Sequence, residues 1–284
     1  MLRISKISFP GFNIGEFEVD SVAFSIGKFD IAWYALIITI GMIFAVWYVA
    51  YRAKSIGITF DDIIDYPLFA IPIGVIGARL YYVMSKPESF DSFSEILNIR
   101  SGGLAIYGGL IAGAITVFVV TKIKKIPFMA IADCAMPGII LAQAIGRWGN
   151  FMNGEAFGYE TDIFCRMGIN NALTGFETIY VHPTFLYECL WNVLGFVLVN
   201  LFYKKRQYDG QIFLAVCAWY GLGRMLIEGL RSDSLYTSIF GLQFRTSQVL
   251  AAAILLVCIG VMIYFQIKKP KKSFYSKKEK KELK

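Results

Sequence analysis

The chain has 284 residues, of which 56% are hydrophobic, 16% aromatic and 17% charged. Its mean hydropathy of +0.56 is too apolar for a soluble domain of this length, so the composition indicates an integral membrane protein. The net charge of +7 does not indicate nucleic-acid binding, because nine lysines lie between residues 268 and 284 and predict a basic cytoplasmic tail.

Cysteine and histidine usage excludes several kinds of site. The five cysteines are isolated from one another and form neither a CxxC pair nor a disulfide pattern. Cys165 falls in a predicted outer loop, where its thiol is passive or reactive, and we assign the cysteines no chemistry. A single histidine, His182, excludes a multi-histidine metal site. We expect no metal and no organic cofactor.

Seven apolar segments are long enough to cross a bilayer. They cover roughly residues 31–51, 63–84, 104–121, 128–146, 184–203, 211–230 and 247–267. Residues 1–30 mix charges, glycine and short alternating stretches, and they lack the uninterrupted apolar centre of a cleavable signal. The sequence therefore predicts an all-α polytopic membrane protein with a catalytic membrane domain over residues 1–267 and a tail over 268–284.

Aromatic residues mark both ends of the first span, as is typical of membrane interfaces. They are Trp33 and Tyr34 at one end and Trp47, Tyr48 and Tyr51 at the other. Tyr34 is therefore an interfacial anchor, or a residue whose hydroxyl faces a lipid headgroup.

Glycines and one arginine characterise the second and third spans. Gly74 and Gly77 allow close helix approach in the second span, and Gly109–Gly113 forms a GxxxG face in the third. Arg79, inside the second span, snorkels, pairs or serves a site. Tyr107 lies among glycines, so its hydroxyl is expected in a crowded interior.

The fourth span closes with residues 143–158, which supply an arginine, two asparagines, a glutamate and four glycines. Arg147 offers five fixed donors suited to a phosphate or carboxylate, and the glycines let backbone amides approach an anion. The stretch suggests anionic headgroup chemistry, or else a loop whose arginine snorkels toward lipid phosphates. Helical periodicity places Asp133, Gln143 and Arg147 on one polar face.

The segment from residue 147 to residue 183 is too long and polar for a tight turn, so we predict a small outer subdomain there. After it, Thr184 is expected to cap the fifth span, and Glu188 to lie about one turn inside the membrane.

One face of the sixth span carries Tyr220, Arg224, Glu228 and Arg231. Arg224 and Glu228 are four residues apart and are predicted to pair. The pair makes the charges tolerable in lipid, or it orients Arg224 toward a bound anion.

Positive charge orients the spans. Seventeen lysines and arginines lie on the side of the tail and nine on the other side, which predicts an extracytoplasmic N-terminus and a cytoplasmic C-terminus. The outer ends of the spans then collect polar groups at one level of one leaflet: Arg79, Tyr107, Arg147, His182, Glu188 and Arg224. A charge distribution driven only by folding has no reason to collect in this way.

The run from Gly146 to Glu155, Gly-Arg-Trp-Gly-Asn-Phe-Met-Asn-Gly-Glu, with Gly158 beyond it, resembles the signature of bacterial prolipoprotein diacylglyceryl transferases. Further matches follow in family order over nearly all of the chain apart from the outer loop and the tail. They are Trp33-Tyr34, Gly102-Gly103, Gly108-Gly109, Asp133, Pro137, His182-Pro183, Tyr187-Glu188, Arg224, Glu228 and Arg231.

The resemblance implies seven helices in the cytoplasmic membrane of a bacterium. It also implies transfer of the diacylglyceryl group from phosphatidylglycerol to the lipobox cysteine of a preprolipoprotein, with a thioether formed and glycerol 1-phosphate released. Arg147 and Arg224 correspond to the essential arginines that hold the lipid phosphate, and Glu228 to the acid that supports Arg224.

We expect catalytic roles for Arg147, Arg224, Tyr107 and Glu228. We expect substrate-binding positions at Tyr34, Arg79, Gly103, Asn150, Asn153, Glu155, Gly158, His182, Glu188, Tyr220 and Arg231.

Tyr107 departs from the family pattern. Many members place a histidine there, which has been proposed to deprotonate the thiol, and a phenol of pKa near ~10 is a poor base at neutral pH. We hypothesise that Tyr107 positions a substrate by hydrogen bonding, while the positive site or the lipid phosphate activates the thiol.

Other functions also fit the same residues. Intramembrane arginines and glycine-broken helices also suit a transporter or a lipid-binding membrane protein, although the sequence shows no repeated halves. A diverged homologue that acts on a different acceptor also fits, as does an inactive homologue that serves as a lipoprotein scaffold.

Overall fold

The computed structural model describes residues 3–90, 92–99, 102–232, 236–239, 242–268, 273 and 275. The chain divides into two compact units. The first contains the residues up to Tyr48 and those from Ala135 to the end of the last helix, and the second contains residues 49–134. The predicted tail, residues 268–284, lies almost entirely outside the described residues.

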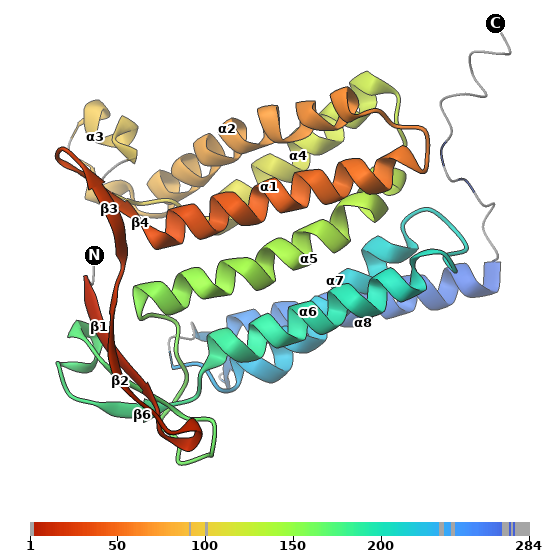
Figure 1. Cartoon of the computed structure of the whole chain (residues 1–284). Helices are drawn as coiled ribbons and strands as arrows, with labels where there is room; N and C mark the ends of the chain where they lie inside the picture. Colours follow the sequence, from red (N-terminus) through yellow and green to blue (C-terminus); the bar gives the residue numbers. More distant parts are fainter. Residues whose placement is uncertain are drawn as a thin grey trace, which may run out of the picture. The chain divides into compact units, whose positions relative to one another are not determined.

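Two helices pass from one unit to the other: α1 (Trp33–Lys54) and α5 (Phe128–Asn153). The remaining elements of the first unit are β1 (Ile4–Phe9), β2 (Ile14–Asp20), β3 (Val22–Ile26), β4 (Phe29–Ala32), β5 (Met167–Asn170), β6 (Ile179–Val181), α6 (Thr184–Tyr203), α7 (Gln211–Glu228), β7 (Tyr236–Ile239), β8 (Leu242–Arg245) and α8 (Thr246–Lys268) (Figure 1).

The strands show that the expectation of an all-α chain is wrong outside the membrane helices. Burial alternates along Ile4–Phe9, where Ser5 and Ile7 are buried and Ile4 and Lys6 are exposed, which is the period of a half-buried strand. Four strands form a sheet in the order β2-β1-β5-β6, with Ile7 opposite Phe17 on one side and Ile169 on the other. The N-terminal segment and the predicted outer loop thus fold together.

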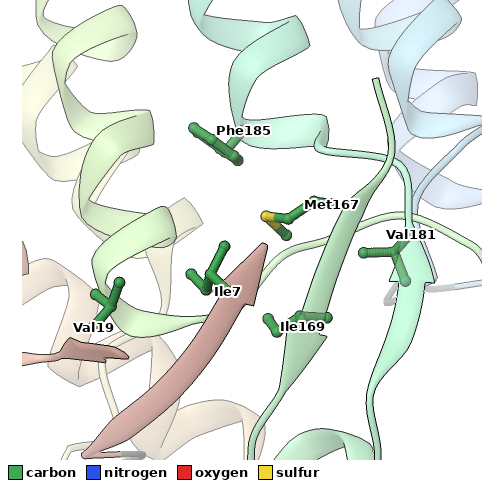
Figure 2. Close-up of a cluster of buried hydrophobic side chains, with 6 residues drawn as sticks. All are labelled: Ile7, Val19, Met167, Ile169, Val181 and Phe185. Carbon is green, nitrogen blue, oxygen red and sulfur yellow. The ribbon is translucent and has the colours of Figure 1, made fainter. Parts of the chain in front are cut away.

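A small apolar core joins this sheet to the start of α6. Ile7, Met167, Ile169 and Val181 are almost fully buried, and Figure 2 shows Phe185 reaching toward them from the first turn of α6. Glu188 follows Phe185 by about one turn of α6, so this core fixes the position of Glu188.

The fold is mostly helical and is that of a polytopic membrane protein. Six helices within the described residues are long and apolar enough to cross a membrane: α1, α2 (Phe60–Ser85), α4 (Ile106–Lys124), α5, α6 and α8. The predicted sixth span corresponds to α7, which has 18 residues and carries Arg224 and Glu228.

Two local predictions about helix ends are corrected by the structure. The helix α5 continues to Asn153, so the signature residues from Arg147 to Asn153 are helical rather than part of a loop. Thr184 is not the cap of α6, because Pro183 holds that position; instead the Thr184 hydroxyl donates to the carbonyl of Ala156 at 2.5 Å.

In the second unit α2 packs closely against α4, with the short helix α3 (Phe93–Leu97) between them in sequence. A Cβ on Gly77 would lie 2.8 Å from the carbonyl oxygen of Gly108, and one on Gly108 would lie 2.3 Å from that of Gly77. The close-approach role of Gly77 is confirmed. The expected GxxxG face is only half correct, since no atom lies within 4 Å of a Cβ on Gly113.

Candidate active site

Glu188 is the centre of a charged cluster in the first unit. Its side chain is 8% exposed, and its carboxylate contacts three guanidinium groups. Arg147 Nη2 pairs with Oε2, while Nη1 of Arg224 and Nη1 of Arg231 lie 3.5 and 3.1 Å from Oε1. Arginines from α5, α7 and the segment after α7 therefore converge on one carboxylate.

Arg224 makes a second ion pair within α7. Its Nη2 lies 2.8 Å from Oε2 of Glu228, whose side chain is 2% exposed, so the predicted pair is confirmed. Three guanidinium groups and two carboxylates therefore lie in one contact network. Guanidinium groups gathered in this way are suited to bind an anionic group such as a phosphate.

The signature residues extend the cluster along α5. Arg147 Nη1 donates to Oδ1 of Asn150 at 3.3 Å, and the amide nitrogens of Asn150 and Asn153 each donate to Oε1 of Glu155 at 3.1 Å. Four of the predicted site residues are therefore linked in one hydrogen-bonded chain, which fixes the amide groups beside Arg147.

A cavity of about 480 Å³ borders this network. Its lining residues are Asn150, Glu155, Ala156, Phe157, Leu173, Arg231 and Ser232. Arg147 and Arg224 are behind this lining, connected to it through Asn150 and through the carboxylate that Arg224 shares with Arg231. The cavity thus has Arg231 at its wall, Arg147 one contact away through Asn150, and Arg224 two contacts away through Glu188.

The turn after α5 is built on tight backbone contacts. Gly154 has φ +62°, and a Cβ there would lie 2.1 Å from Oγ of Ser5. Asn171, which is buried, donates through Nδ2 to the Gly154 carbonyl at 2.8 Å and to the Ser5 hydroxyl at 3.1 Å. Asn171 was missed in the sequence because nothing local links it to the signature.

Gly158 brings three segments together. Its amide donates to the carbonyl of His182 at 3.0 Å, and a Cβ on it would lie 2.6 Å from the carbonyl oxygen of Leu230. The next amide, that of Tyr159, donates to the same Leu230 carbonyl at 2.8 Å. Only glycine fits here, so this position holds the segment carrying Arg231 beside the signature turn.

His182 lies before α6, and its backbone is hydrogen-bonded to the segment of Gly158 and Tyr159. Its amide donates to the Tyr159 carbonyl at 3.0 Å, and its Nδ1 lies 3.3 Å from the hydroxyl of Tyr187. Burial lowers the pKa of His182, so the imidazole is neutral at neutral pH.

The two tyrosines predicted for this site occupy its helices. The ring of Tyr34 lies against α5, where a Cβ on Gly149 would come within 2.7 Å of it. Tyr220 precedes Arg224 by one turn of α7 and is 37% exposed. The glycine of the signature is thus what allows the first-span tyrosine to approach α5 between Arg147 and Asn150.

Comparison with known proteins identifies the family. The family model described as prolipoprotein diacylglyceryl transferase matches residues 21–264. The chain belongs to this family. It is similar to the phosphatidylglycerol--prolipoprotein diacylglyceryl transferase of Enterococcus faecalis, with 40% identity over 93% of this chain and 96% of that protein.

Two clostridial relatives carry the same name. The protein numbered 1 in Clostridium perfringens is 41% identical over 86% of this chain and 93% of its own, and that of Clostridioides difficile is 43% identical over 76% and 85%.

In this family member, two tryptophans lock α6 to α7. The rings of Trp191 and Trp219 stack at 4.2 Å, and each indole N–H donates to the other residue's carbonyl, at 3.1 and 3.0 Å. Each indole also lies where a Cβ on a glycine of the other helix would be, Gly223 for Trp191 and Gly195 for Trp219. This lock sets the register of Glu188 against Arg224, and the sequence analysis missed it.

Arg245 is a second residue that sequence reasoning missed. Its Nη1 donates at 2.5 Å to the carbonyl of Glu228, which ends α7, and its Nη2 lies 3.4 Å from the Tyr159 hydroxyl. A cation at a helix C-terminus is favourable, so Arg245 holds the last turn that carries Glu228. No spacing pattern indicates this contact, because its two residues are 17 positions apart.

Three of the predicted site residues belong to the second unit. Arg79 is buried, and its guanidinium donates to four backbone carbonyls, those of Glu95, Ile96, Gly102 and Gly103, at 2.6–3.0 Å. A Cβ on Gly103 would lie 2.5 Å from Nη1 of Arg79. The arginine therefore fixes the segment that leads to Tyr107, in the first turn of α4. Tyr107 is 42% exposed, so the expectation that it lies in a crowded interior is wrong.

Proposed function

We propose that this protein transfers the diacylglyceryl group of phosphatidylglycerol to the thiol of the lipobox cysteine of a preprolipoprotein, in the first step of bacterial lipoprotein maturation. The proposal is supported by the names of the curated relatives, which are phosphatidylglycerol--prolipoprotein diacylglyceryl transferases. The observation that carries it is the convergence of Arg147, Arg224 and Arg231 on Glu188.

The reaction places negative charge where these arginines are. The cysteine sulfur attacks the glyceryl carbon, a carbon–sulfur bond forms, and the bond from that carbon to the phosphate oxygen breaks. Glycerol 1-phosphate leaves with the electron pair and becomes a dianion. Guanidinium groups aimed at this leaving group stabilise the transition state more than the ground state, since the charge develops during the step.

The nucleophile belongs to the substrate, so the enzyme needs only to favour its thiolate. A thiol has a pKa near ~8.5, and a positive field or a nearby base lowers it. The guanidinium groups of Arg147, Arg224 and Arg231 would supply such a field. In this scheme the departing glycerol 1-phosphate dianion takes up the proton that the thiol releases and so ends as a monoanion. Tyr107 orients a substrate through its hydroxyl.

We further propose that the chain crosses the cytoplasmic membrane seven times, with its N-terminus outside and its tail inside. The site then faces the outer leaflet, where secreted preprolipoproteins arrive. Glu228 orients Arg224, and Asn150, Asn153 and Glu155 fix the groups beside Arg147.

The main test is substitution of the two arginines on helices. We expect Arg147→Ala or Arg224→Ala to insert normally and to lower the rate of thioether formation by at least roughly 100-fold, because a group that stabilises developing charge is lost. The rate is measured with labelled phosphatidylglycerol and a lipobox peptide. Lysine at either position should restore little, because it lacks the planar fork.

Arg166→Ala provides the matched control. Arg166 lies on the outer subdomain, where its guanidinium donates to the carbonyls of Asp162 and Ile163 and lies over the ring of Tyr180. Its loss should leave the rate within about twofold. Full activity of Arg147→Ala would refute the proposed mechanism.

A further inference from the structure

The hairpin formed by β3 and β4 has one apolar and one polar face. Ile26 pairs with Phe29 and Phe24 with Ile31, so these four side chains share a face, while Ser25 pairs with Asp30 on the other. The Ser25 hydroxyl donates to Oδ1 of Asp30 at 2.5 Å, which closes the polar face on itself.

The apolar face is open. Phe24 is 49%, Ile26 63% and Phe29 60% exposed. In a hairpin of eleven residues from Val22 to Ala32, such exposure is unfavourable in water, and contiguous apolar surface of this kind marks a place of contact.

The hairpin is directly continuous with a membrane helix. β4 ends at Ala32 and α1 begins at Trp33, whose indole is 40% exposed and whose amide donates to the carbonyl of Ser21 at 2.9 Å. That bond closes the base of the hairpin on the first residue of the helix. The hairpin is therefore held at the level where the span enters the lipid.

The tip of the hairpin adds a charge of the right sign for a phospholipid surface. Gly27, with φ +61°, and Lys28 make the two-residue turn, and Lys28 is exposed. An ammonium group beside an apolar face is the arrangement of interfacial anchors, where the cation meets lipid phosphates.

We propose that the β3–β4 hairpin lies on the membrane surface and inserts Phe24, Ile26 and Phe29 into the lipid interface, with Lys28 on phospholipid phosphates. The partner is the lipid bilayer rather than a protein. This anchor sets the depth of the adjoining Tyr34, whose ring lies against Gly149. The inference rests on the membrane span of α1 and not on the transfer reaction.

The test is photocrosslinking in vesicles of phosphatidylglycerol and phosphatidylcholine. The full chain carries p-benzoylphenylalanine at Ile26 in one variant and at Ser25, on the polar face, in the other. We expect lipid adducts by mass spectrometry at position 26 and at least about fivefold fewer at position 25. The same residue at Ile43, an exposed position inside α1, reports the efficiency of lipid crosslinking.

Equal lipid adducts at positions 25 and 26 would overturn the proposal, because the face would then not be selective. So would an absence of adducts at 26 while position 43 crosslinks, or crosslinking of 26 to an added lipobox peptide in place of lipid. None of these outcomes depends on turnover, so each is separate from failure of the proposed reaction.

Discussion

At the scale of single residues, Glu188 occupies the position that an anionic ligand would share. Its carboxylate lies between Arg147, Arg224 and Arg231, and it is almost buried. Removing one partner from a buried charge cluster leaves the other charges uncompensated. The loss of folding stability is then larger than the net contribution of the intact cluster to that stability. Glu188 therefore balances the arginines as well as orienting them.

We expect Glu188→Gln to destabilise the protein by roughly 3 kcal/mol, because three guanidinium groups lose their shared carboxylate. Sulfate should restore part of the lost melting temperature, since an anion that binds the folded state stabilises it. Thermal unfolding in detergent with and without sulfate measures both effects. Glu160→Gln, at an exposed position on the outer subdomain, is the control. A melting temperature of Glu188→Gln that does not respond to sulfate would contradict the balancing role.

Pairs within one helix were predictable and pairs between helices were not. The spacing of four residues was enough to pair Arg224 with Glu228, because helix geometry is fixed. The meeting of Glu188 with Arg147 depends on how α5 and α6 are turned against each other. That rotation is set by side-chain packing between the two helices, such as the contact of the Trp148 and Phe185 rings at 5.5 Å, so no local pattern contained it.

At the scale of elements, the stacked pair of Trp191 and Trp219, called the tryptophan lock here, determines how α6 and α7 are turned against each other. Gly223 precedes Arg224, and Trp191 follows Glu188 by three residues, so the lock lies within one turn of the ion pair. The glycines are needed because each indole fills the space of a side chain on the facing helix.

We expect Gly223→Ala to push the two helices apart, since its Cβ would lie 2.1 Å from Nε1 of Trp191. Overpacking of this kind costs roughly 1–3 kcal/mol, and transferase activity should fall at least about tenfold as Arg224 moves from Glu188. Gly260→Ala in α8, where no atom lies within 4 Å of the added Cβ, should be neutral in both thermal unfolding and activity. If Gly223→Ala and Gly260→Ala had equal effects on stability and activity, the tryptophan lock would not be the cause of the losses.

The strands were missed for a different reason. The sequence Ile-Ser-Lys-Ile-Ser-Phe from Ile4 to Phe9 has no strict alternation, and β1 pairs with β5 more than 150 residues later in the chain as well as with the nearby β2. Such a short run forms a strand only when its partners and a core are available, and the outer loop supplies one partner and three of the core residues. The membrane helices were predictable because a bilayer imposes length and apolarity on each span independently.

At the scale of the whole molecule, α7 decides how many times the chain crosses the membrane. It is not among the six described helices that are long and apolar enough to cross a membrane, but it returns along α6 after the short connection from Lys204 to Gly210. Glu188 at the start of α6 contacts Arg224 near the end of α7, so the two helices run antiparallel over most of their lengths. With 20 and 18 residues they extend about 30 and about 27 Å, and each is long enough to span the hydrocarbon core.

We expect epitope tags to report this topology. A tag after Asp162 should be digested by protease added to intact spheroplasts, whereas tags after Lys205 and after Lys284 should be digested only once the membrane is opened. The positive charge of the two tagged inner segments is the physical reason. The three positions together decide whether α7 crosses. A chain in which α7 does not cross would place the tags after Lys205 and Lys284 on opposite sides of the membrane.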